Sequence, residues 1–159
     1  MPKTTRSKPK PAATAASSPA ATDPQPTSEL VALVGECVMP WVFADRFVQE
    51  PAYREDTLAL VREHIVGGFC MFGEQATQVA ETVRHLQQEA ATSHGTPLIF
   101  SCDCEFGLPM RLKEGGTEFP DMMAIGRTGD PALAAAVGTA IAQEMRALGL
   151  AWNFAPVAD

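Results

Sequence analysis

The chain has 159 residues, 46% of them hydrophobic, so it has room for one domain of ordinary size with a substantial core. Its net charge of −7 argues against nucleic-acid binding, because a nucleic-acid-binding face must gather cations that displace counterions from phosphates. No apolar run approaches the roughly 20 residues needed to cross a bilayer, and the N-terminus lacks the apolar middle section of a secretory signal. We therefore expect no membrane partner and a cytoplasmic location.

Residues 1–28 form a leader that differs in composition from the rest of the chain. Ala, Pro, Ser and Thr dominate it without apolar periodicity, which predicts disorder because too little surface can be buried to offset chain entropy. Its charged side chains are Lys3, Arg6, Lys8, Lys10 and Asp23, which gives +3 and leaves −10 for the remaining chain. The simplest interpretation is a solvated leader, and a weak electrostatic tether is the alternative.

Beyond the leader, helical and strand-like patterns alternate. The apolar segment Leu30–Ala44 predicts a short helix followed by the first strand. Asp56–Val66 carries apolar residues at helical spacing, and Gly67-Gly68 is the expected stop of that helix. Phe69–Phe72 is wholly apolar, which predicts a strand that is covered on both faces, as in a parallel sheet.

The same alternation continues toward the C-terminus. Gln75–Ser93 has one apolar stripe, which predicts a helix that Gly95 ends, and Leu98–Asp103 predicts the next strand. Asp130-Pro131 is typical of a helix start, with an N-cap followed by a proline in the first turn. The predicted buried face of this third helix comprises Leu133, Val137, Ile141, Met145 and Leu148. Trp152–Val157 predicts the last strand.

Strands separated by single helices predict right-handed crossovers and a parallel α/β sheet. The sheet belongs either to a doubly wound fold or to a barrel. No G-x-G-x-x-G or G-x-x-x-x-G-K-[ST] motif follows a strand, which removes the phosphate cradle of the nucleotide-binding folds. We therefore predict a segment of an α/β barrel, with about four strands and three helices.

The cysteines and histidines do not indicate a metal centre. The four cysteines, which lie in apolar surroundings without CxxC spacing, are Cys37, Cys70, Cys102 and Cys104. This pattern predicts buried, reduced thiols and not disulfides or zinc ligands. The three histidines, none of which lies beside a plausible nucleophile, are His64, His85 and His94. We therefore expect no metal and no cofactor.

Asp103 is the main candidate for a functional residue. Ile99, Ser101 and Asp103 share one side of the predicted strand, and in a barrel that side faces the interior at the catalytic rim. Asp103 either binds a polar ligand there or accepts backbone N–H bonds of the following loop. Glu105 either completes an acid/base pair with it or organises a turn. Arg111 is the nearby cation, and its guanidinium suits a sugar hydroxyl or a carboxylate.

Several sequence blocks occur in the same order in a known family. They are Gly67–Gly73, Asp103–Gly107 followed by Arg111 and Thr117–Pro120, Glu144–Gly149, and Asn153–Asp159. Over about 30–159 the chain resembles the N-terminal domain of family 3 glycoside hydrolases. Its Asp-x-Glu-x-Gly form is most similar to the β-N-acetylhexosaminidase branch, which removes N-acetylglucosamine from cell-wall fragments. The β-glucosidase branch is the alternative.

The resemblance implies a carbohydrate substrate and a retaining mechanism through a covalent glycosyl-enzyme. It implies that Asp103 binds hydroxyls of the sugar at the subsite where the bond breaks, and that Arg111 also contacts the substrate. The family's aspartate nucleophile and histidine acid/base match no position of this chain, because they come after the last predicted strand. We therefore assign no catalytic residue here and expect the 159 residues alone to be inactive.

The family's complete domain resembles a (β/α)8 TIM-type barrel of about 250 residues or more. The resemblance therefore implies that residues 29–159 form the N-terminal half of such a barrel and that the chain is truncated within it. A half barrel exposes unpaired strand edges and an apolar inner face, which predicts self-association. A shortened, non-catalytic protein that binds a sugar or a partner is the alternative to an incomplete hydrolase.

Overall fold

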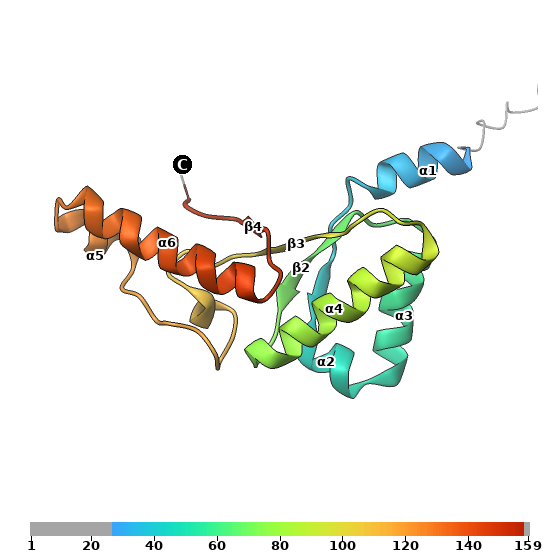
Figure 1. Cartoon of the computed structure of the whole chain (residues 1–159), viewed down its shortest axis with the longest axis horizontal. Helices are drawn as coiled ribbons and strands as arrows, with labels where there is room; N and C mark the ends of the chain where they lie inside the picture. The colour runs from blue at the N-terminus through green and yellow to red at the C-terminus, as the bar shows by residue number, and fades with distance from the viewer. Residues whose placement is uncertain (1–26, 158–159) are drawn as a thin grey trace, which may run out of the picture.

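The computed structural model describes residues 27–157, so the predicted leader, apart from its last two residues, lies outside the described residues. Figure 1 shows the elements in chain order. They are α1 (Ser28–Gly35), β1 (Trp41–Phe43), α2 (Ala44–Gln49), α3 (Pro51–Arg62), β2 (Gly68–Phe72), α4 (Ala76–Ser93), β3 (Ile99–Cys102), the 3-10 turn η1 (Leu108–Met110), α5 (Met122–Arg127), α6 (Pro131–Ala147) and β4 (Trp152–Asn153).

The four strands form one parallel sheet in the order β1-β2-β3-β4, which confirms the predicted half-barrel α/β fold. The register aligns one row of residues across the sheet: Trp41 pairs with Cys70, Cys70 with Ser101, and Ser101 with Trp152. Paired residues of neighbouring strands point to the same face. This row therefore lies on one face of the sheet, and the alternate residues lie on the other.

The alternate residues make the core. Val42, Met71 and Phe100 are almost fully buried, and α2, α3 and α4 pack together beside this face of the sheet (Figure 1). The helical residues buried with them include Phe47, Val61, Val79, Val83 and Leu86. Burying these apolar side chains is the main force that stabilises the fold.

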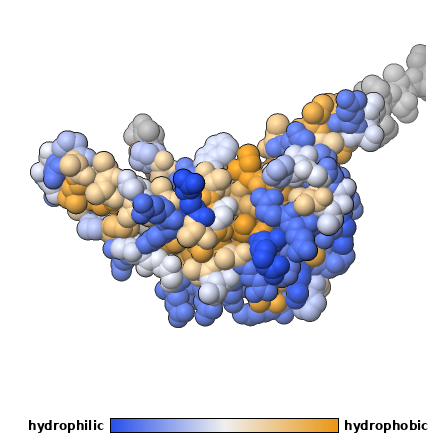
Figure 2. Space-filling model, in the orientation of Figure 1, coloured by the Kyte–Doolittle hydropathy of each residue, from blue (hydrophilic) through white to orange (hydrophobic). Residues whose placement is uncertain are grey.

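The opposite face of the sheet, called the open face below, is exposed at its large side chains, whereas the small Cys70 and Ser101 at its centre are buried. Large apolar side chains remain exposed on it: Trp41 (70%), Phe43 (37%), Ile99 (46%) and Trp152 (48%). Figure 2 shows apolar surface over the middle of the molecule, where the strands lie in Figure 1. In a closed barrel this face would line the interior.

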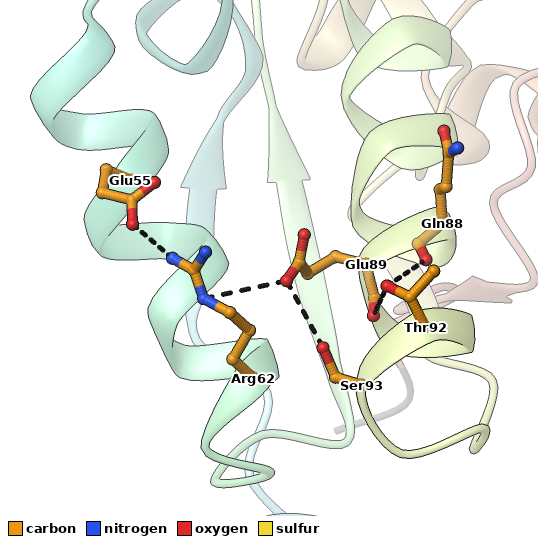
Figure 3. Close-up of polar contacts among 6 residues, drawn as sticks. All are labelled: Glu55, Arg62, Gln88, Glu89, Thr92 and Ser93. Atoms are coloured by element: carbon orange, nitrogen blue, oxygen red, sulfur yellow. Dashed lines mark hydrogen bonds and ion pairs between the residues drawn. The ribbon is translucent and has the colours of Figure 1, made fainter.

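Polar contacts join α3 and α4 on the helical side, as Figure 3 shows. Arg62 Nη2 donates to Glu55 Oε1 at 2.5 Å within α3, and its Nε lies 3.7 Å from Glu89 Oε1 on α4. Glu89 Oε1 also accepts from Ser93 Oγ at 3.3 Å. Of these contacts, the one between Arg62 and Glu89 joins the two helices, and it adds little stability because both side chains are partly exposed.

The predicted helix over Asp56–Val66 begins earlier and ends earlier than expected. α3 begins at Pro51, in the first-turn position that suits proline, and ends at Arg62. Gly67 and Gly68 do not end this helix. They allow neighbouring backbone segments to approach each other closely. A Cβ at Gly67 would lie 2.0 Å from Glu36 O, and one at Gly68 would lie 1.9 Å from Ile99 O.

Other differences concern short elements and single residues. The helices α2 and α5 and the turn η1 were not predicted, because elements of three to six residues give too little periodicity. β4 covers only Trp152–Asn153 of the predicted strand. Leu133 is 41% exposed, so it does not belong to the buried face of α6. Cys37 is exposed, contrary to the prediction, because it follows α1 at the surface.

Candidate functional site

Asp103 lies directly after β3, at the carboxyl end of the parallel sheet. It continues the alternation of Ile99 and Ser101, so its side chain stands on the open face, and 28% of that side chain is exposed. Ligands of parallel α/β folds bind at this end of the strands. The cavities beside α1 and α6 are lined by other residues.

Arg111 turns back toward Asp103. The turn η1 carries the chain around, and the Arg111 backbone N–H donates to Leu108 O at 2.9 Å. The guanidinium Nη2 then donates to Asp103 Oδ2 at 2.7 Å, and both side chains are 28% exposed. Arg111 Nε is buried and makes no hydrogen bond within residues 27–157. The pair therefore combines a carboxylate acceptor with a guanidinium donor that is only partly used.

An aromatic ring lies under the guanidinium. Arg111 Cζ is 5.3 Å from the centroid of Phe72, the last residue of β2. The Phe72 ring also packs against Trp41 at 5.7 Å and Phe43 at 5.5 Å between centroids. Aromatic faces and a charge pair together are the groups that bind the apolar and hydroxyl surfaces of a small polar ring.

Two hydrogen bonds of one side chain hold the loop after Asp103. Asn153 Oδ1 accepts from the Cys104 backbone N–H at 2.9 Å, and Asn153 Nδ2 donates to Cys104 O at 3.2 Å. The side-chain amide of Asn153 thus continues the pairing between the two segments beyond Cys102, where the strand pairing ends. These bonds fix the backbone next to Asp103 from 49 residues away.

Further contacts hold the segment between β3 and α5 against the rest of the fold. Both carboxylate oxygens of Glu144 on α6 accept from the Thr117 backbone N–H, at 3.2 and 3.1 Å. Gly107 has φ +111°, and a Cβ there would lie 2.6 Å from Thr117 O, so only glycine fits this crossing of the loop. Glu74 after β2 pairs with Lys113 beyond the turn η1.

Glu105 does not share the surroundings of Asp103. It is half-buried and lines a cavity of about 250 Å³ between α6 and the end of β4, together with Asn153 and Met145. The structure therefore does not support an acid/base pair of Asp103 and Glu105. Glu105 belongs to the turn that carries the loop under α6.

The thiols of Cys102 and Cys70, near Asp103, are buried. A hydrogen bond with the Cys104 thiol, together with burial, raises the pKa of Cys102 well above its ordinary range. Burial also raises the pKa of Cys70 on the open face. Raised pKa values keep a thiol protonated and poorly nucleophilic. Within residues 27–157, no group of three or more His, Cys, Asp or Glu side chains is arranged to hold a metal ion.

The sequence interpretation missed Phe72, Asn153 and Glu144 as parts of this site. All three residues lie in the sequence blocks that resemble the family, which is the one available signal for them. Nothing in the pattern around Phe72 shows which cation its ring meets. No helix within residues 27–157 combines the length and apolar character that a membrane crossing needs.

Comparisons with known proteins give a consistent result. Residues 30–159 match the family described as the glycosyl hydrolase family 3 N terminal domain. A β-hexosaminidase of Nitrosospira multiformis is 34% identical over 105 residues, which are 62% of this chain and 30% of that protein. A β-N-acetylglucosaminidase/β-glucosidase of Cellulomonas fimi is 35% identical over 63% of this chain and 17% of that protein.

A solved structure is similar as well. A glycoside hydrolase family 3 β-N-acetylglucosaminidase from Paenibacillus sp. str. FPU-7 superimposes with a TM-score of 0.68 at 37% sequence identity. The match covers 80% of this chain and 24% of that chain. The chain thus spans about a third or less of the length of the relatives it matches.

Proposed function

Because the chain belongs to the glycosyl hydrolase family 3 N-terminal domains, we propose that Asp103 and Arg111 bind the sugar of a retaining glycoside hydrolase. The observation that carries the proposal is the 2.7 Å pair of these two side chains at the carboxyl ends of parallel strands. A carboxylate accepts from sugar hydroxyls and a guanidinium donates to them, so the pair can fix a pyranose ring in one orientation.

We propose that the activity is that of a β-N-acetylhexosaminidase acting on N-acetylglucosamine-containing cell-wall sugars. The names of the relatives from Nitrosospira multiformis and Paenibacillus support this activity. The described residues then bind and orient the sugar, and neither the nucleophile nor the acid/base is assigned to them. The β-glucosidase alternative is supported by the double name of the Cellulomonas fimi relative.

Binding of free sugars to the 159-residue chain tests the proposal. We expect Asp103→Asn to weaken N-acetylglucosamine binding by about tenfold or more, because a hydrogen bond to a charged group contributes about 1.5–3 kcal/mol. Isothermal titration calorimetry with N-acetylglucosamine and with glucose measures the affinities and separates the two branches of the family. Glu81→Gln on the exposed face of α4 is the matched control. Equal affinities of the two variants would contradict the proposal.

We also propose that the open face of the sheet causes self-association and that the chain has no nucleic-acid partner. The exposed rings of Trp41 and Trp152 at the two edge strands support the first statement. The charge of −10 outside the leader supports the second, because it repels phosphates.

A further inference from the structure

We propose that Phe72 is a positioning residue that holds the Arg111 guanidinium in place for the sugar site. This inference rests on the proposed function of Arg111. The guanidinium lies between two groups: Asp103 Oδ2 is 2.7 Å from Nη2, and the centroid of the Phe72 ring is 5.3 Å from Cζ.

Asp103 alone does not orient the guanidinium. A single Nη2–Oδ2 bond leaves the planar group free to rotate about that contact, and a long arginine side chain has many rotamers. A partly exposed ion pair is also screened by water. The ring of Phe72 supplies the second constraint, because a guanidinium above the negative face of a ring is attracted to it and packs parallel or close to it.

Phe72 is itself held by its neighbours. It ends β2 and pairs in register with Phe43 of β1, and the two ring centroids are 5.5 Å apart. Trp41 meets the same ring at 5.7 Å with an interplanar angle of 60°, which is an edge-to-face contact. The ring orientation is thus fixed by two strands, so the position of Arg111 depends on β1 and β2 as well as on β3.

This arrangement leaves guanidinium donors for a ligand. The Arg111 side chain is 28% exposed, and one of its N–H groups, on Nη2, is bonded to Asp103 Oδ2. A guanidinium carries five N–H donors, so the accessible part of the group can still donate to a ligand oxygen. With the plane of the guanidinium fixed by Phe72 and Asp103, these donors have defined directions, and a sugar hydroxyl is the acceptor that the proposed function supplies.

The test compares variants of the 159-residue chain that change one feature each. Phe72→Leu removes the ring and keeps an apolar side chain, and Phe72→Tyr keeps the ring. Trp152→Leu is the matched control, because Trp152 is an exposed aromatic residue of the same face whose ring packs against Phe154. The two readouts are the NMR resonance of the Arg111 Nε–H group, which senses the ring current of Phe72, and the affinity for N-acetylglucosamine.

We expect Phe72→Leu to move the Arg111 Nε–H resonance toward that of free arginine and to weaken sugar binding by about two- to fivefold. Phe72→Tyr and Trp152→Leu should leave the resonance near its original position. An unchanged resonance in Phe72→Leu would overturn the inference. If the resonance moves but neither Phe72→Leu nor Asp103→Asn changes sugar affinity, the positioning of Arg111 stands and the proposed function fails.

A second variant keeps the test decisive if Phe72→Leu does not fold. Incorporation of trifluorophenylalanine at position 72 preserves the shape of the ring and weakens the negative potential of its face. The Arg111 resonance should then move in the same direction as in Phe72→Leu, with an unchanged urea unfolding midpoint. A resonance that stays in place with the fluorinated ring would overturn the inference.

Discussion

Asp103, Arg111 and Phe72 show how single side chains acquire their roles from their neighbours. The side chains of Asp103 and Arg111 are each 28% exposed, so their ion pair contributes little to stability, about 0–1 kcal/mol. The same exposure leaves both groups accessible to a ligand. Phe72 of β2 and Asn153 of β4 hold this ion pair in place although it stabilises the fold little. The pair is therefore better suited to binding a ligand than to stabilising the fold.

A second cluster lies at the opposite end of the strands, where the sequence indicated nothing. The rings of His64 and His94 stack with 4.0 Å between centroids, and Glu36 Oε1 is 3.5 Å from His64 Nε2. Burial and the nearby His64 lower the pKa of His94, and Glu36 opposes them. Folding therefore favours the neutral form of His94.

The residue-scale prediction concerns the pH dependence of stability. Since the pKa of His94 is lowered in the fold, this stabilisation is complete above its ordinary value of 6.5 and is lost as pH falls below it. We expect the urea unfolding midpoint to decrease between pH 7.5 and 5.5, and His94→Gln to reduce that decrease. His85→Gln, on α4, is the control and should keep the full decrease. Equal pH dependence in the wild type and His94→Gln would contradict this account.

At the scale of elements, close backbone contact decides where the strands lie. β2 and β3 approach so closely at Gly68 that a Cβ there would lie 1.9 Å from Ile99 O. In contrast, a Cβ at Gly138 in the middle of α6 would meet no atom of a neighbouring element within 4 Å, so the lack of a side chain there serves no packing purpose. The two glycines therefore have opposite energetic roles.

The element-scale prediction uses that contrast. Gly68→Ala should lower the free energy of unfolding by about 2–4 kcal/mol, because the backbone of β3 must move away. Gly138→Ala should raise it by about 0.5–1 kcal/mol, because alanine is the better helix former and meets no neighbour. Urea denaturation of both variants measures the two changes. A stable Gly68→Ala protein would show that the strands are not packed as described.

At the scale of the whole molecule, the sheet is covered on one side only. Three strands, β1, β3 and β4, contribute exposed large apolar residues to the open face: Trp41, Phe43, Ile99 and Trp152. At about 150–250 Å² for each fully buried aromatic side chain, the exposed parts of these residues amount to several hundred Å² per copy. A patch of that size on a soluble domain is typical of an interaction surface.

The whole-molecule prediction follows from that patch. The 159-residue chain should sediment as a species larger than a monomer, and Trp41→Glu or Trp152→Glu should shift it toward the monomer, because a charge opposes burial of the face. Met123→Glu is the control, since Met123 is 68% exposed on α5, away from the sheet. Sedimentation velocity over a range of concentrations measures the change. A monomeric wild type, or equal dissociation by the control, would contradict the prediction.

Local sequence determined the elements that depend on near neighbours. The start of α6 was predictable because Asp130 accepts from the N–H groups of Ala132 and Leu133, a contact within one turn. The strand that ends before Asp103 was predictable because its alternation and apolar character are local. The position of Asp103 at the end of a parallel strand, and hence its candidacy for a site, needed no tertiary structure.

Only the tertiary structure decided which groups meet Asp103 and how they are held. The bond to Arg111, the ring of Phe72 and the amide of Asn153 join segments 8 to 49 residues apart, and no periodicity encodes such pairs. The stacking of His64 on His94 depends in the same way on how two loops converge. Contacts of this kind exist only after the strands have paired in register, because the register sets which distant residues share a face.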